Sequence, residues 1–174
     1  DDATRSIFLY IAPNDHIVLE GDFKQLEDYT VKGNKGSVSI QQLVSISKAR
    51  FTLLDSAYSK LRAATPEKKD SLQKIFMSEK NAYVDFVKDF INKEKNVDVA
   101  CFALNYFGPM MQDEIPYLVE VIDRLHKSAP DSKYIEGWYK QMQQYRDAIV
   151  KENEGGVALN AQAPNIILQS PSGD

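Results

Sequence analysis

From Ser37 onward the apolar residues recur at intervals of three and four, which is the period of an α-helix with one buried face. The pattern continues for about seven turns to Ala64. Thr65 and Pro66 then supply an N-cap and a first-turn proline for a second helix, predicted to end near Lys93. Because such a short connection returns one helix alongside the other, we expect a long antiparallel helical hairpin.

Three further helices are predicted after the hairpin. The first runs from about 97 to 107 and ends at the Gly-Pro pair 108–109. The second runs from about 113 to 127, and the third from about 131 to 152. The glycine pair 155–156 is predicted to be a hinge.

The residues before the helices have a strand-like composition. Residues 7–12 and 16–22 are rich in β-branched and aromatic side chains and are predicted to form a hairpin around a turn at 13–15. Residues 29–33 are predicted to add a third short strand. The chain therefore starts with a small antiparallel β element.

The last residues return to a strand pattern. Pro164 imposes an extended approach on the apolar run 166–168, and the Ser, Pro, Gly and Asp residues of 170–174 favour a turn. A strand cannot satisfy its backbone hydrogen bonds alone. We therefore expect this segment to open a domain that continues beyond Asp174.

The tail resembles the entry of thioredoxin-like domains of the TlpA/ResA and AhpC/TSA kind. In that family the entry reads G-x-x-A-P-x-F-x-L before a short turn, and here the A-P pair at 163–164, Leu168 and the turn at 172–174 match. Asn160 and Ile166 stand where the family usually has Gly and Phe.

The start of the chain carries a second part of the same resemblance. Segments 8–15, 18–22 and 29–33, followed by long helices, are similar to the end of a β domain of unknown function and its helical insert. That region precedes the thioredoxin domain in many bacterial envelope thiol-disulfide oxidoreductases. The order of the segments matches the family along nearly the whole chain.

Pattern and resemblance together predict an α+β fold: a short N-terminal antiparallel β element, a mainly helical body, and a C-terminal segment that begins a thioredoxin-like domain. The predicted parts are the last strands of an N-terminal β domain at 1–36, a helical domain at 37–154, and a linker with the first strand of the next domain at 155–174.

The resemblance implies a function for this region. The Cys-x-x-Cys centre of the family would follow Asp174, so this chain is expected to be non-catalytic and to serve dimerisation or substrate presentation. Its redox partners and protein substrates would meet the downstream domain. A periplasmic or cell-envelope location is implied, with a lipid anchor as one form of attachment. If earlier β strands are lacking, the edge of strand 7–12 is expected to pair with another copy of the chain.

Composition excludes some other classes. The net charge of -4 and the lack of a Lys/Arg cluster argue against a nucleic-acid-binding surface. No apolar run approaches the length that crosses a bilayer. We therefore expect neither a nucleic-acid partner nor a transmembrane segment.

Two candidate reactive groups have simpler explanations. Cys101 lies in an apolar helical stretch, so we interpret it as a buried, inert thiol. Asp123 and His126 have the one-turn spacing of a metal-binding pair, but the sequence offers no second such pair on another helix. We predict no catalytic, cofactor-binding or metal-binding residue and no cofactor.

A cluster of aromatic and methionine residues near the Gly-Pro break has two interpretations. Such side chains can form an adaptable peptide-binding groove, although they fill helical cores more often. The groove interpretation gives the alternative function, a self-contained helical module that binds proteins or peptides without a redox role. The cluster comprises Phe102, Tyr106, Phe107, Met110, Met111, Tyr134, Trp138 and Tyr139.

Overall fold

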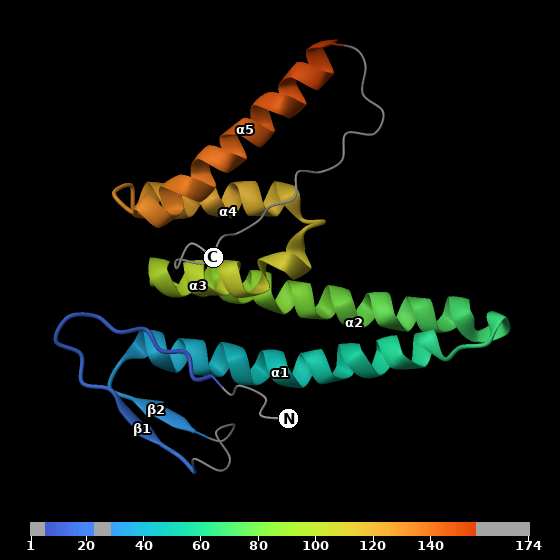
Figure 1. The fold of residues 1–174 in the computed structure, drawn as a ribbon, viewed down its shortest axis with the longest axis horizontal. Helices are drawn as coiled ribbons and strands as arrows, with labels where there is room; N and C mark the ends of the chain where they lie inside the picture. The colour runs from blue at the N-terminus through green and yellow to red at the C-terminus, as the bar shows by residue number, and fades with distance from the viewer. Residues whose placement is uncertain (1–5, 23–28, 156–174) are drawn as a thin grey trace. The chain divides into compact units, whose positions relative to one another are not determined.

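A computed structural model describes residues 6–22 and 29–155 of the chain, and the side chains of these residues except those of 134 and 148–155 (Figure 1). A two-stranded sheet precedes five α-helices and one short 3-10 helix, so the described part is α+β and mostly helical. The elements are β1 (Val18–Glu20), β2 (Thr30–Lys32), α1 (Lys35–Arg62), α2 (Pro66–Lys93), α3 (Val97–Phe107), η1 (Gly108–Met111), α4 (Ile115–Ser128) and α5 (Lys133–Gly155).

The chain divides into two compact units, Asp1–Ala103 and Leu104–Asp174. The first unit contains the sheet, α1 and α2, and the second contains α4 and α5. The strand predicted at 166–168 and the start of a thioredoxin-like domain lie outside the described residues.

The sheet differs from the predicted hairpin. β1 pairs with β2 in antiparallel register, with Leu19 opposite Val31. Residues 7–12 form no strand, so the prediction that they pair with 16–22 was wrong. The hydroxyl of Ser37 accepts a hydrogen bond from the N–H of Tyr10 (3.0 Å) and donates one to its carbonyl (2.6 Å), which ties this segment to the start of α1.

The first turn of α1 is fixed by a side-chain cap. The side-chain carbonyl of Asn34 accepts a hydrogen bond from the N–H of Ser37 at 2.9 Å. The Asn34 amide also donates to the carboxylate of Asp15, which accepts a second bond from the N–H of Ala12 at 2.7 Å. Because Asn34 is the cap, α1 begins at Lys35, two residues before the predicted start.

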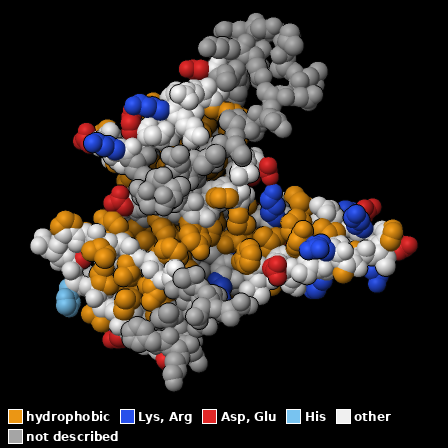
Figure 2. Space-filling view, viewed as in Figure 1, with side chains coloured by type: hydrophobic (Ala, Val, Ile, Leu, Met, Phe, Trp, Pro, Cys, Tyr) orange, Lys and Arg blue, Asp and Glu red, His pale blue; other side chains and the backbone are white. Residues whose placement is uncertain are grey.

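Helices α1 and α2 lie side by side and antiparallel, joined by residues 63–65 (Figure 1). Near the open end of this hairpin the facing side chains are buried, including Ile40 and Leu43 of α1 and Val87 and Ile91 of α2. Between residues 48 and 80 only Ala57 is buried. In Figure 2 charged side chains crowd around the turn of the hairpin, and hydrophobic ones gather towards its open end.

The core of the second unit follows the helical period. On α4 the buried positions are 118, 121, 122 and 125, and on α5 they include Ile135, Trp138 and Met142. These spacings of three, four and seven residues form one apolar stripe on each helix. In the described part of the chain, no helix is both long and apolar enough to cross a membrane.

We predict that Gly33→Ala destabilises the protein by at least about 2 kcal/mol, since its backbone lies where side chains are strained. Gly33 has φ 95°, and an added Cβ would lie 1.9 Å from the carbonyl oxygen of His16. Urea denaturation followed by circular dichroism measures the change. Gly137→Ala is the control: its Cβ would meet nothing within 4 Å, and it should stabilise α5 by about 0.5–1 kcal/mol. Equal effects of the two changes would contradict the argument.

Candidate functional site

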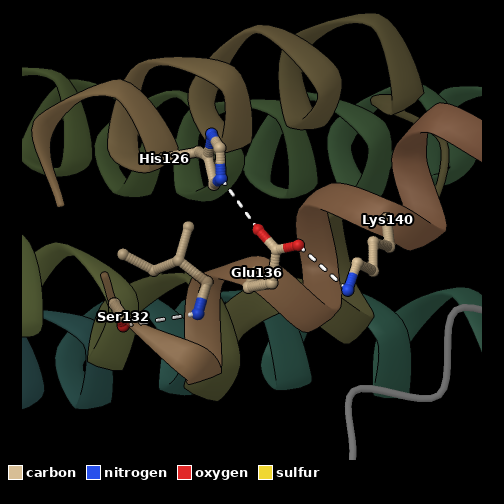
Figure 3. Close-up of polar contacts among 5 residues, drawn as sticks. His126, Ser132, Glu136 and Lys140 are labelled. Carbon is tan, nitrogen blue, oxygen red and sulfur yellow. Dashed lines mark hydrogen bonds and ion pairs between the residues drawn. The ribbon is translucent and has the colours of Figure 1, made fainter. Parts of the chain in front are cut away.

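A cluster of polar side chains joins the end of α4 to the start of α5 (Figure 3). His126 Nε2 lies 2.9 Å from Glu136 Oε2, and Lys140 Nζ lies 3.0 Å from Glu136 Oε1. The ring of His126 stacks on that of Tyr139, with centroids 3.9 Å apart and planes 5° apart. One carboxylate therefore holds two basic side chains from two helices.

The local sequence explains this arrangement. His126 is in the last turn of α4 and Glu136 in the first turn of α5, where an acidic side chain is favoured by the helix dipole. Tyr139 and Lys140 follow Glu136 by three and four residues and so share its face. At the start of α5 the hydroxyl of Ser132 accepts a weak hydrogen bond from the N–H of Ile135 at 3.5 Å (Figure 3).

The charge of Glu136 is stabilised by its partners. The hydrogen bond from Lys140, and secondly the one with His126, lower the pKa of the Glu136 carboxyl below its usual value. The carboxylate is therefore held ionised and paired. Such a group is a poor general acid or base, because its lone pairs are already engaged.

A second ion pair links the two helices. Arg146 Nη2 lies 2.5 Å from Asp123 Oδ2, while Asp123 Oδ1 is buried and has no hydrogen-bond partner among the described residues. Asp123 and His126, which have metal-pair spacing in the sequence, thus contact different partners. Among the described residues, no three His, Cys, Asp or Glu side chains are placed to hold a metal ion.

The same surface of α4 carries a shallow hollow of about 540 Å³. This volume falls within the range of small-molecule sites. Its lining mixes acidic and basic groups, and its one hydroxyl, on Ser128, donates to the carbonyl of Arg124 at 2.9 Å. The lining residues are Pro116, Val119, Glu120, Asp123, Arg124, Lys127, Ser128 and Arg146. The hollow thus offers charge pairing but no nucleophile activated by a base.

Cys101 is buried, with 5% of its surface exposed. Burial, and secondly the negative charge of Asp98, raise the pKa of its thiol to about 12. Because the thiolate is the reactive form, this side chain is an inert part of the core. The structure thus supports the interpretation made from the apolar sequence around it.

Several of the aromatic and methionine residues with described side chains are buried. Phe107, Met111 and Trp138 are buried, which favours core packing for these members. Phe102 contacts the ring of Phe8 at 5.3 Å. The most exposed member with a described side chain is Tyr106, at 48%.

Comparison of the chain with protein-family models, with curated proteins and with solved structures gave no match.

The two interhelical pairs were not anticipated from the sequence. A basic residue in the last turn of one helix and an acidic one in the first turn of the next, as in His126 and Glu136, is the signal that could have indicated the first. The pair of Asp123 with Arg146 depends on the angle between α4 and α5, which no local pattern encodes.

Glu136→Gln is predicted to lower stability above about pH 4.5 and to have less effect at lower pH. The sign follows from the lowered pKa of the folded state: the stabilisation is present when the carboxyl is ionised and is lost as pH falls through that pKa. Urea denaturation between pH 7 and pH 3.5 measures it. Asp147→Asn, at an exposed site on the same helix, is the control and should show a smaller dependence. A pH-independent effect of Glu136→Gln would contradict the pairing.

Cys101 should react with a thiol reagent such as dithionitrobenzoate far more slowly in the native protein than in urea. A pKa of about 12 in place of 9.0 lowers the thiolate fraction near pH 8 roughly a thousandfold. The linked effect on stability has a defined sign: stability should fall as pH rises above 9, where the unfolded thiol ionises and the folded one does not. Equal labelling rates with and without urea would show that the thiol is accessible.

Proposed function

We propose that this chain is the non-catalytic N-terminal region of a cell-envelope thiol-disulfide oxidoreductase. The observation that carries the proposal is the order of sequence segments: the motifs at 8–15, 18–22 and 29–33, then long helices, then the A-P motif at 163–164. A β element followed by a mostly helical body agrees with that order. The redox chemistry would belong to a thioredoxin-like domain downstream of Asp174.

The chemistry of the described residues is consistent with an accessory role. The thiol of Cys101 is buried and its pKa is raised. The charged groups Glu136 and Asp123 are engaged by Lys140, His126 and Arg146. These groups stabilise the packing of α4 on α5, and a catalytic group would instead need an unengaged lone pair or an exposed thiolate.

The shape of the first unit suits a role in dimerisation or substrate presentation. Helices α1 and α2 each have 28 residues, and a helix of that length extends about 42 Å. The half of this hairpin next to its turn exposes large apolar side chains, a feature typical of interaction surfaces. The region would position either a second copy or a substrate near the redox domain.

The alternative is a helical binding module without a redox role. Its main support was the aromatic and methionine cluster, and the burial of Phe107, Met111 and Trp138 removes much of that surface. The remaining support for a binding module is the exposed side chain of Tyr106 and the hollow on α4.

The first experiment is to read the encoding frame through Asp174 and to assay the full-length product for reduction of insulin disulfides. We expect a downstream Cys-x-x-Cys, and loss of the reductase activity when both of its cysteines are changed to serine. Cys101→Ala in the same full-length protein is the control and should keep the activity, because the native thiol is unreactive. A stop codon directly after Asp174 would refute the proposal and favour the binding module.

A further inference from the structure

One face of α1 combines exposed aromatic side chains with charges of opposite sign. Residues 44, 48, 51, 55 and 58 follow one another at intervals of four, three, four and three, so their side chains lie on one side of the helix. The aromatic members are Phe51 and Tyr58, which are 56% and 46% exposed. We call this set, Val44, Lys48, Phe51, Asp55 and Tyr58, the α1 face.

The described part of the chain covers this face only in part. The ring of Tyr58 contacts that of Phe76 on α2, with centroids 5.7 Å apart, and nearly half of the side chain still faces solvent. Val44 is half-buried, and Lys48 and Asp55 are exposed. The Asp55 carboxylate makes no hydrogen bond or ion pair within the described residues. Contact between water and two large aromatic groups is unfavourable, so covering them with a partner would favour association.

The order of side chains on the α1 face is the same from either end, except that the sign of the charge reverses. It runs hydrophobic, positive, aromatic, negative, hydrophobic, with Val44 and Tyr58 as the two hydrophobic ends. An antiparallel copy of the same helix therefore presents a negative charge opposite each positive one. This property is what a two-fold symmetric interface requires, because each surface must complement itself.

We propose that the α1 face is a homodimer interface in which α1 packs antiparallel against α1 of a second copy. A two-fold axis passing close to Phe51 sets Lys48 of each copy opposite Asp55 of the other. Val44 of each copy then packs against Tyr58 of the other, and the two Phe51 rings meet at the centre. The two hairpins together form a four-helix arrangement of antiparallel neighbours.

Charge determines both the partner and its direction. A parallel copy would place Lys48 on Lys48 and Asp55 on Asp55, and like charges in contact oppose association. A strongly acidic or basic partner would attract one of these residues and repel the other. A second antiparallel copy places an opposite charge beside each of them, and the aromatic centre excludes water from between the charge pairs.

This interface differs from the one expected at the edge of residues 7–12, which form no strand in the described structure. It deepens the dimerisation part of the proposed function and rests on that part. The redox part is tested separately by the insulin assay, so the failure of one does not imply the failure of the other.

The test is sedimentation equilibrium of the full chain over a range of concentrations. The unchanged protein should be a monomer–dimer system. Lys48→Glu alone or Asp55→Lys alone places two like-charge contacts in the interface, so each should raise the dimer Kd by about tenfold or more. The double variant Lys48→Glu/Asp55→Lys restores two opposite-charge contacts and should return the Kd close to its original value.

Two further variants sharpen the result. Phe51→Glu should give a monomer, with circular dichroism to check that the helices persist. Lys60→Glu reverses a charge at an exposed site of α1 outside the α1 face and should leave the Kd within about twofold, since screened distant charges contribute little. Three results would overturn the proposal: a protein that stays monomeric at all concentrations, a dimer insensitive to the single reversals, or a double variant that is not rescued. Because the reversed residues are exposed, the test does not depend on Phe51→Glu folding.

Discussion

The hydrogen bonds around the start of α1 hold the non-helical part of the first unit in place. Asn34 caps the helix by accepting from the N–H of Ser37, and its amide contacts Asp15, which in turn holds the N–H of Ala12. The Ser37 hydroxyl binds both backbone groups of Tyr10. A two-stranded sheet is marginal by itself. These contacts hold the segment before β1 against the start of α1, and the burial of Val31 packs β2 on the same helix.

The helices of the first unit could be predicted from the sequence, and its N-terminal segment could not. The helical period and the Thr65-Pro66 signal gave α1 and α2 with ends within about two residues, because local side-chain spacing determines a helix. The strand expected at 7–12 failed because one serine, distant in the sequence, competes for the backbone of Tyr10. Strand formation depends on a partner, and composition does not show which partner the backbone finds.

The polar groups between α4 and α5 show a similar limit. Both the spacing of Asp123 and His126 and the pattern of Glu136, Tyr139 and Lys140 are visible in the sequence. The spacing of three on α4 would allow Asp123 and His126 to share one partner such as a metal ion, although the sequence analysis predicted no metal site. Instead α5 contributes one opposite charge to each of them, Arg146 and Glu136, because the side chains of two packed helices meet according to the angle and register of the pair. The sequence analysis thus singled out Asp123 and His126 but gave neither of their partners.

Helical periodicity has a further ambiguity, and the α1–α2 hairpin shows it. Leu43 and Phe51 belong to the same repeating pattern of apolar residues, yet Leu43 is fully buried and Phe51 is more than half exposed. The period identifies an apolar stripe on the helix. It does not show whether the surface that covers the stripe comes from the same chain or from another. In the first half of α1 the apolar side chains are covered by α2 and by the segment that Ser37 binds. In the second half, the charges of Lys48 and Asp55 beside Phe51 add the missing information, because charges that complement themselves only in an antiparallel pair favour a second copy of this chain.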